Sequence, residues 1–478
     1  MDALLRTLVA GLARGEADAR ALESLGCADP ARAGERLCAA AAHPALAATR
    51  ERWLPELLLS ARPAAGAEYL LELAARLGGR LDLAAVPLLP RLLGSSDALA
   101  RVLLRHPNWT AELAGALPGA PSAADVEPEW TPIRIAKYKG LLRIAARDLG
   151  GRPFEQSLAE LSQLADRCLA AALACAGAEA GVAPPALFAL GKLGGYELNF
   201  SSDVDLLFIR ENAADGGEPA ELSRSIELIR CFKKHLEVPS EDGFGYRIDL
   251  ELRPEGRQGV IVNSVDSALS HYENFGHDWE RQMLIRLRFV AGAREPGEAF
   301  ERGLRPFVWR RTVGNDAVRA VRAMKRRIED ERLEAGRDLE ADLKEGPGGI
   351  RDVEFLVQAF QLLFGGREPS LRTGNVLEAL AALERAGLLD ASVTEELRDA
   401  YLWLRRAEHA VQLVEERQTQ AFPREPNAQL GLARRLAYPQ LEGARARDAL
   451  LDDWTRVRAR VRTHFENLVL ESSDADRA

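Results

Sequence analysis

The spacing of apolar residues divides the chain into three regions, and the first, residues 1–149, follows a helical period. Stretches such as EYLLELAARL and DALARVLLRH place apolar side chains at positions i, i+3 and i+4, along one face of a helix. Prolines, among them Pro63 and Pro107, interrupt these rows because proline cannot donate a backbone hydrogen bond inside a helix. The pattern predicts an all-helical N-terminal domain made of short helices.

The second region, residues 150–294, mixes helical and strand patterns. The stretch SLAELSQLADRCLAAALACA predicts a helix, and three apolar runs after it predict strands at Ala186–Leu190, Val204–Ile209 and Tyr246–Leu252. A further helical stretch, SRSIELIRCFKKHLE, lies between the second and third runs. Helices that alternate with short strands are typical of a domain with a small mixed sheet.

The third region, residues 295–478, returns to long helical patterns such as AVRAVRAMKRRIEDERLE and LRDAYLWLRRAEHAVQLVEE. The glycine-rich stretch Gly346–Gly349 interrupts them and predicts a turn that opens a new helix, IRDVEFLVQAFQLLF. A C-terminal helical bundle follows from this pattern. The fold class predicted for the whole chain is therefore α+β and mostly helical, with a small mixed sheet flanked by helical domains.

Composition excludes several classes of protein. The 478 residues are 47% hydrophobic and 28% charged, as in globular proteins, and no apolar run is long enough to span a membrane. The N-terminus lacks the apolar core of a secretory signal and reads as an amphipathic helix. The formal net charge of −9 disfavours a nucleic-acid partner and favours a protein or small-molecule substrate.

Cysteine and histidine usage points to the kind of metal to expect. The five cysteines are scattered without a CxxC pair, which argues against a zinc knuckle or a disulfide frame and for reduced thiols in a cytoplasm. The seven histidines do not cluster at metal-ligand spacing either. A metal in this protein is therefore expected to be a hard ion held by carboxylates, Mg²⁺ or else Mn²⁺.

The segment LGKLGGYELNFSSDVDLLFI carries the strongest chemical signal. Asp203 and Asp205 are two residues apart at the start of a predicted strand, so their side chains project to the same face. An isolated Asp-x-Asp is more often a solvated turn, but here a strand and a glycine-containing turn come before it. Two close carboxylates repel unless positive charge lies between them, and a pair of divalent metals would also clamp the oxygens of a phosphoryl displacement.

The turn before these aspartates has the features of a phosphate site. Gly191 allows the backbone to approach a phosphate, and N–H groups of the turn that contains Gly194 can face an anion. Lys192 and Ser202 are expected to add contacts to the same phosphates. These four residues are the candidate nucleotide ligands of this segment.

The run GYRIDLELRP offers a third carboxylate. If it is a strand, Arg247, Asp249, Glu251 and Arg253 share one face, which is either solvated or the wall of an active site. Beside an Asp-x-Asp metal site, Asp249 becomes the expected third metal ligand. Arg247 and Arg253 would then contact phosphate oxygens, and Glu251 could pair with one of these arginines.

The glycine turn, the Asp-x-Asp and a later third aspartate resemble the nucleotidyltransferase superfamily of the polymerase-beta type. The resemblance extends to the glutamine synthetase adenylyltransferase/adenylyl-removing enzyme family, whose motifs run in the same order from about Ala186 to Pro423. The matching segments are GKLGGYELNFSSDVDLLF, GYRIDLELRPEG, HDWERQMLIRLR, LRPFVWRR, GGIRDVEFLVQAFQLLFGGREPSLR and LRRAEHAVQLVEERQTQAFP. This family duplicates its nucleotidyltransferase unit, and one such unit is found here, most similar to the N-terminal, adenylyl-removing half.

The resemblance implies roles for individual residues. Asp203, Asp205 and Asp249 match the catalytic, metal-binding carboxylates, and Gly191 with Lys192 matches the nucleotide-phosphate turn. The family usually carries arginine where this chain has Glu251, which alters the charge beside Asp249. Further candidates for nucleotide or acceptor contacts, with a purely structural role as the alternative, are Glu280, Arg281, Arg286, Arg351, Asp352 and Glu354.

The function implied is removal of AMP from the adenylylated tyrosine of glutamine synthetase by inorganic phosphate, which yields ADP. Glutamine synthetase is the implied protein substrate, and the signalling protein PII is an implied regulator. One alternative is the reverse reaction, an ATP-dependent adenylyl transfer to the same protein. A second is a regulatory module that senses nucleotide without turnover, and a small-molecule nucleotidyltransferase ranks last.

Overall fold

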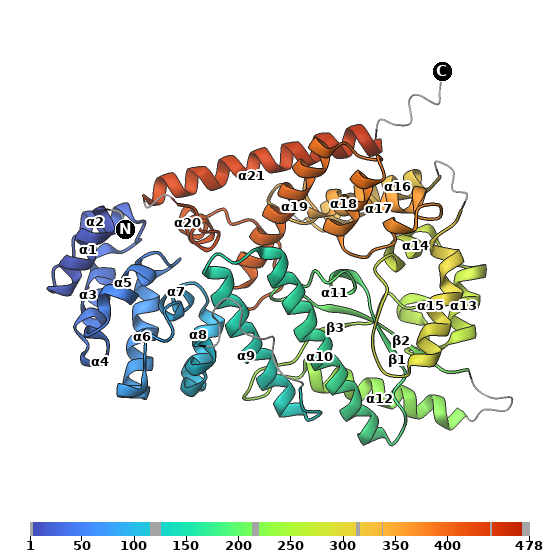
Figure 1. Ribbon diagram of the computed structural model, residues 1–478, viewed down its shortest axis with the longest axis horizontal. Helices are drawn as coiled ribbons and strands as arrows, with labels where there is room; N and C mark the ends of the chain where they lie inside the picture. The colour runs from blue at the N-terminus through green and yellow to red at the C-terminus, as the bar shows by residue number, and fades with distance from the viewer. Residues whose placement is uncertain are drawn as a thin grey trace.

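Helices make up most of the protein and surround one small β-sheet (Figure 1). The computed structural model describes residues 3–114, 126–212, 219–311, 316–336, 338–439 and 442–470. The expected α+β, mostly helical class is confirmed. No described helix combines the length and the apolar character that crossing a lipid bilayer requires.

The N-terminal region is helical, as the apolar spacing predicts, and it forms the blue end of the molecule in Figure 1. Pro63 opens one helix and Pro107 opens a 3₁₀ segment, because the first turn of a helix needs no N–H from proline. The α-helices of this region are α1 (Ala3–Ala13), α2 (Ala19–Ser24), α3 (Pro30–Ala42), α4 (Pro44–Ala47), α5 (Arg50–Leu58), α6 (Pro63–Leu77), α7 (Leu89–Leu93) and α8 (Asp97–Arg105).

The sheet has five strands in the described residues, in the order β3-β2-β1-β5, with β4 also paired to β2. β1 is antiparallel to β2 and β5, whereas β3 and β4 run parallel to β2. Their bounds are β1 Ala186–Ala189, β2 Val204–Arg210, β3 Ile248–Asp249, β4 Asn263–Ser264 and β5 Arg288–Ala291. The C-terminal end of β1 and the first residues of β2 and β3 therefore meet at one end of the sheet.

The third expected strand, Tyr246–Leu252, is reduced to Ile248–Asp249. The strand stops because Oδ1 of Asp249 accepts the backbone N–H of Glu251 at 2.7 Å, which turns the chain. The guanidinium of Arg253 then donates to backbone carbonyls of its own loop and closes it. The prediction that four charged side chains share one strand face is therefore wrong beyond Asp249. Strands β4 and β5 were not expected from the sequence pattern.

Two groups of helices pack around this sheet. Those that lie between or beside the strands are α9 (Trp130–Leu149), α10 (Phe154–Ala180), α11 (Gly191–Gly194), α12 (Pro219–Glu237), α13 (Val265–Asn274) and α14 (Asp278–Leu284). The C-terminal group is α15 (Arg294–Val308), α16 (Asp316–Glu334), α17 (Ile350–Phe364), α18 (Val376–Arg385), α19 (Ala391–Gln412), α20 (Pro426–Arg435) and α21 (Gly443–Phe465). The glycine-rich turn does open α17, as expected.

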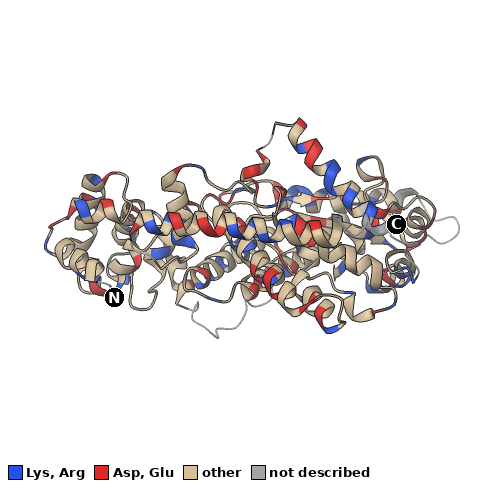
Figure 2. Cartoon of the chain, turned by 90° about the horizontal axis from the view of Figure 1, so that it is seen from above, with Lys and Arg blue, Asp and Glu red and all other residues tan. Residues whose placement is uncertain are grey.

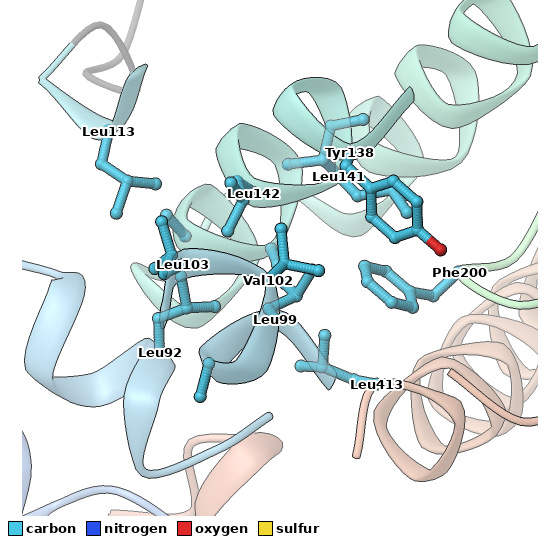
Figure 3. Close-up of a cluster of buried hydrophobic side chains, with 14 of the residues drawn as sticks. Leu92, Leu99, Val102, Leu103, Leu113, Tyr138, Leu141, Leu142, Phe200 and Leu413 are labelled. Carbon is cyan, nitrogen blue, oxygen red and sulfur yellow. The ribbon is translucent and has the colours of Figure 1, made fainter. Parts of the chain in front are cut away.

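Alternate residues of the sheet belong to two different hydrophobic cores. Leu206 and Phe208 of β2 join a core that reaches back to the N-terminal helices, whereas Leu207 and Ile209 join a core built with the C-terminal helices. Successive side chains of a strand point to opposite faces, so the sheet separates the two cores. Figure 3 shows part of the first core, where side chains of α7, α8 and α9 meet Phe200 and Leu413.

The C-terminal end of α19 is tied to the N-terminal helices. The hydroxyl of Ser96 donates to the carbonyl of Leu413 at 2.6 Å, and the N–H of Ala98 donates to the carbonyl of Val414 at 3.1 Å. Just beyond, the Glu416 carboxylate accepts from Nζ of Lys137 at 2.6 Å and from the hydroxyl of Tyr138 at 3.0 Å. Segments about 300 residues apart in sequence are thus joined by hydrogen bonds.

Candidate active site

Three aspartates meet at the end of the sheet where β1 ends and where β2 and β3 begin. Asp205 of β2 is in register with Asp249 of β3, and Asp203 lies two residues before Asp205. All three line one pocket of about 450 Å³. A volume of this size is typical of small-molecule sites. The spacing in the sequence therefore does bring the three carboxylates together in space.

The surroundings of Asp205 disfavour its charged form. Desolvation by the surrounding protein, followed by the negative charges of Asp203 and Asp249, raises the pKa of Asp205 to about 7, and Lys344 and Lys192 oppose this rise. None of the three aspartates makes an ion pair with another described residue. Uncompensated oxygen ligands that converge on one space are the donor set that Mg²⁺ or Mn²⁺ prefers, so these residues fit a hard divalent ion.

The glycine turn that follows β1 is a single helical turn, α11. Gly191 has a φ of +51°, and a Cβ at this position would lie 2.0 Å from Oδ2 of Asp205. Glycine is needed here both for the left-handed backbone and for the space that Asp205 occupies. Gly194 does not line the pocket: it is buried, and a Cβ there would lie 1.9 Å from the carbonyl oxygen of Arg286. Its role is close backbone packing.

Lys192 lines the pocket, but its charge is already engaged. Its Nζ lies 2.6 Å from Oε1 of Glu408 on α19, whose side chain is completely buried. Burial lowers the pKa of Lys192 to about 8, although the Glu408 charge opposes this shift. Oε2 of Glu408 accepts from the side-chain amide of Asn199 at 2.6 Å, and the Arg405 guanidinium is 3.5 Å away. The structure thus makes Lys192 part of a buried charge network instead of a free phosphate ligand.

Ser202 lines the same pocket as the aspartates, whereas Arg247 and Arg253 line a neighbouring hollow that shares Asp203 and Asp249 with it. Arg247 donates to the backbone and side-chain oxygens of Ser201, the former at 2.6 Å. The two arginines therefore lie beside the carboxylates but outside the main pocket. Glu251 pairs with neither: its partner is Arg257, at 2.6 Å, and both side chains are exposed.

The C-terminal helices supply the opposite charges of the pocket. The cations that line it from this side are Arg332 of α16, Lys344 of the turn before α17, and Arg351 of α17. Glu345 and Glu354 line the pocket beside them. Arg332 pairs with Glu345, and Arg351 lies 3.8 Å from the same carboxylate. Sequence reasoning anticipated Arg351 and Glu354 but missed Lys344, Arg332 and Glu408, since only the fold brings them to the aspartates.

Of the other candidates, Arg286 lines the pocket, yet it is almost fully buried between two carboxylates. It lies 3.1 Å from Glu354 and 3.3 Å from Glu197, and the Arg286 charge holds the pKa of Glu354 at about 2 against the opposing effect of burial. Arg286 and Glu354 therefore form a buried ion pair in the pocket wall.

Three candidates have structural roles instead. Glu280 accepts the backbone N–H of His277 at 2.8 Å, and this contact caps α14. Arg281 donates to the carbonyl of Phe307 at 3.1 Å. Asp352 accepts the N–H of Gly348 at 2.8 Å. None of the three lines the pocket, so the structural alternative holds for each.

Apolar side chains complete the pocket and could receive a flat, weakly polar group. They come from the loop after β3 and from three helices: Leu252, Trp279, Met283, Met324, Ile328 and Phe355. Aromatic and methionine side chains pack well against planar rings. The pocket thus combines an acidic end, a cationic wall and an apolar surface, which is the set of features a nucleotide with metal ions requires.

One histidine does lie near other metal-ligand types, contrary to the expectation from sequence. Glu179 of α10 comes together with Cys231 and His235 of α12, away from the pocket. Its carboxylate already accepts from Nε1 of Trp130 at 2.5 Å and from Sγ of Cys231 at 3.1 Å. These contacts join α10 to α12. All five cysteines are free thiols, as expected.

A mostly helical fold around a small mixed sheet is consistent with a nucleotidyltransferase-like fold. Residues 87–303 match the family described as glutamate-ammonia ligase adenylyltransferase, and residues 322–469 match the family described as GlnD PII-uridylyltransferase. The first match contains the sheet with the three aspartates, and the second contains the helices that form the cationic wall.

Among curated proteins, the chain is similar to bifunctional glutamine synthetase adenylyltransferase/adenylyl-removing enzymes. It is 38% identical to that of Stenotrophomonas maltophilia over 76% of this chain and 41% of the relative. The identity is 35% for that of Thioalkalivibrio sulfidiphilus, over 80% of this chain and 42% of the relative. The chain thus spans about two-fifths of the length of the curated relatives it matches. It is homologous to one part of these bifunctional enzymes.

Proposed function

We propose that this protein removes AMP from an adenylylated tyrosine of glutamine synthetase by phosphorolysis. The observation that carries the proposal is the convergence of Asp203, Asp205 and Asp249 in a pocket that also has cationic and apolar walls. Similarity to one part of a bifunctional enzyme that acts on glutamine synthetase supports this choice of substrate. The assignment to the adenylyl-removing part rests on the residues of the motifs around these aspartates, which resemble those of the N-terminal half of the family.

In this proposal Asp203, Asp205 and Asp249 hold two divalent ions, Mg²⁺ or Mn²⁺. When bound, such ions neutralise phosphate oxygens and stabilise the negative charge of the leaving oxygen. The protein fixes their positions: the register of β2 with β3 sets Asp205 beside Asp249, and Gln418 donates to Oδ1 of Asp203 at 2.9 Å. Gly191 leaves the space in which the Asp205 carboxylate lies.

The reaction breaks one bond and forms one. An oxygen of inorganic phosphate attacks the phosphorus of the tyrosine-linked AMP, and the bond from that phosphorus to the tyrosine oxygen breaks. The electron pair leaves with the tyrosine oxygen, which takes a proton from the incoming hydrogen phosphate, and the products are ADP and free tyrosine. A phenol has a pKa near ~10, so its oxygen leaves readily, and phosphate needs no general base to attack. In the reverse direction Asp249 would accept the tyrosine proton.

The partners in this proposal are proteins. Glutamine synthetase is the substrate, and PII is the proposed regulator because residues 322–469 match a PII-uridylyltransferase family. A nucleic-acid substrate is not favoured. In the view of Figure 2 acidic and basic residues are interspersed over the described chain and form no continuous basic stripe.

The test is release of ADP from adenylylated glutamine synthetase in the presence of phosphate and Mg²⁺. The native chain is expected to release ADP, and Asp203→Asn is expected to lower kcat by roughly a hundredfold or more. Asp266→Asn, which removes an exposed carboxylate on α13, is the matched control and should retain native activity. Chelation of divalent ions should abolish release in the native chain.

Other outcomes distinguish the alternatives. ATP-dependent labelling of unmodified glutamine synthetase without ADP release would assign the reverse direction to this chain. Metal-dependent binding of nucleotide without either reaction would assign a sensing role. Native activity in Asp203→Asn would show that these carboxylates are not the metal site.

A further inference from the structure

The cations that line the active-site pocket have carboxylate partners, with one exception among the described residues. Five cations line it, and four of them have carboxylate partners: Lys192, Arg286, Arg332 and Arg351. Within the described residues, Lys344 is the fifth, and its ammonium makes no ion pair and no side-chain hydrogen bond. A partly buried charge without a partner is a costly arrangement unless a ligand supplies the opposite charge.

The backbone holds Lys344 firmly in this place. Oδ1 of Asp342 accepts the N–H of Lys344 at 2.8 Å and that of Glu345 at 2.7 Å. The carbonyl of Lys344 in turn accepts the N–H of Arg351 at 2.9 Å, where α17 starts. The turn is preorganised, so binding an anion there requires little rearrangement of the backbone.

The glycine-rich stretch that follows braces this turn from behind. A Cβ at Gly348 would lie 2.1 Å from the carbonyl oxygen of Arg458 on α21, so this glycine packs directly against that helix. Nε of Arg458 also donates to the carbonyl of Pro347 at 2.9 Å. The GPGG motif, which sequence reasoning treated as a helix start, therefore also fixes the position of Lys344.

A second unpaired donor lies beside it. Nε of Arg351 is buried and has no hydrogen-bond partner in the described part of the protein, although the other end of this guanidinium is 3.8 Å from Glu345. Lys344 and Arg351 thus line the same pocket as the three aspartates, Asp205 among them.

We propose that Lys344, together with Arg351, binds the inorganic phosphate that attacks the tyrosine-linked AMP, and afterwards the β-phosphate of the ADP product. This inference rests on the proposed function, since it names the subsite for the second substrate of that reaction. A single compact ammonium suits a tetrahedral anion that must rotate one oxygen toward the phosphorus, because its donors are not confined to one plane. Neither residue touches the transferred AMP phosphate in this arrangement.

The direct test compares the binding of ADP with the binding of AMP, in the presence of Mg²⁺, to the full chain. The native protein should bind ADP more tightly than AMP. Lys344→Met should weaken ADP binding about tenfold or more and leave AMP binding unchanged, since the subsite holds only the β-phosphate. Lys344→Arg should recover part of the loss. Lys234→Met, on the exposed side of α12, removes a lysine outside the pocket and should change neither affinity.

The kinetic test varies inorganic phosphate at a saturating concentration of adenylylated glutamine synthetase. Lys344→Met should raise KM for phosphate about tenfold or more while KM for the protein substrate stays unchanged. A fall in kcat with an unchanged KM for phosphate would overturn the subsite, as would equal losses of ADP and AMP affinity.

The two proposals can fail separately. If the native chain releases no ADP but Lys344→Met still abolishes the preference for ADP over AMP, the β-phosphate subsite stands and the phosphorolytic function is wrong. If the native chain is active and Lys344→Met alters neither the ADP preference nor KM for phosphate, the phosphorolytic function stands and the subsite is wrong.

Discussion

Nζ of Lys192 lies 2.6 Å from Oε1 of Glu408, so the turn after β1 is joined to helix α19 across more than 200 residues of sequence. The Glu408 side chain is fully buried, and the Lys192 side chain is 12% exposed. The pair therefore fixes the position of the turn α11, which lines the pocket, relative to helix α19. Because Lys192 is paired in this way, it is not among the residues proposed to bind phosphate.

Breaking this pair is expected to destabilise the protein. Glu408→Gln leaves Lys192 and Arg405 without their shared carboxylate, and removal of one member of a buried pair typically costs about 3 kcal/mol or more. Urea unfolding of the variant should show that loss in the free energy of unfolding. The double variant Lys192→Met/Glu408→Gln should recover about 1 kcal/mol or more, which a double-mutant cycle measures as coupling.

An exposed pair provides the control for this experiment. Arg294 and Glu298 form an i, i+4 pair on the surface of α15, and Glu298→Gln should change the free energy of unfolding by less than about 0.5 kcal/mol. Equal effects of Glu298→Gln and Glu408→Gln would contradict the view that burial gives the Lys192–Glu408 pair its importance.

Gly191→Ala should impair the site more than it impairs the fold. A new Cβ 2.0 Å from Oδ2 of Asp205 must displace that carboxylate, and the left-handed backbone adds about 1–2 kcal/mol of strain. We expect a large loss of ADP release and weaker metal binding. Gly181→Ala is a matched control, because Gly181 also has a positive φ, +63°, but nothing lies within 4 Å of the position of its Cβ.

The two glycine variants should therefore lose similar stability in thermal or urea unfolding, while only Gly191→Ala loses activity. If both variants retain native ADP release, the contact between Gly191 and Asp205 does not matter for the site.

The pH dependence of stability should reveal the raised pKa of Asp205. In the folded, metal-free protein this pKa is about 7, whereas an unfolded aspartate titrates near 3.8. Between these values the folded state retains a proton that the unfolded chain has lost, so this group makes stability fall as pH rises from about 4 to about 7. Asp205→Asn should remove that contribution, which appears as a difference between the two pH profiles of the free energy of unfolding.

Metal ions should act on the same profile. Mg²⁺ binds the ionised carboxylates, so its stabilising effect should grow as pH rises toward and above about 7 and should be small in Asp205→Asn. An identical response of the native chain and the variant to Mg²⁺ at pH 8 would argue against Asp205 as a ligand.

Glu251→Arg, which introduces the residue usual in the family, should have little effect. Glu251 is exposed and pairs with Arg257 on the surface, and such pairs contribute about 0–1 kcal/mol. We expect ADP release within about twofold of native and a change in stability below about 0.5 kcal/mol. A larger change in KM for either substrate would place Glu251 in the path of a substrate.

Local patterns predict those features that local physics decides. The positions of Asp203 and Asp205 followed from strand periodicity, and the start of α17 followed from the glycine-rich turn. The length of β3 could not be predicted in this way. The side chain of Asp249 accepts a backbone N–H and turns the chain, and this contact, which competes with the strand, does not alter the alternation of apolar and polar residues.

The cationic wall of the pocket could not be predicted from the sequence for a different reason. Lys344 and Glu408 stand in segments with ordinary helical or turn patterns, and their significance depends on the folding of distant helices over the sheet. A motif of the family resemblance contains Glu408 but none contains Lys344, and no physical argument from sequence alone assigned either residue to the pocket. The pairing of Glu408 with Lys192 became evident only from the distance between their side chains.

The contacts of Glu416 with Lys137 and Tyr138 bear on how the protein can be shortened. A version that begins at residue 150 would keep the three aspartates and every strand, yet it would lose α9 and with it both partners of Glu416. It would also lose the N-terminal part of the core to which Leu206 and Phe208 belong. The change of pattern near residue 150 thus marks where the architecture changes, whereas the hydrogen bonds of Glu416 and the hydrophobic core continue across it, so the two sides depend on each other for packing.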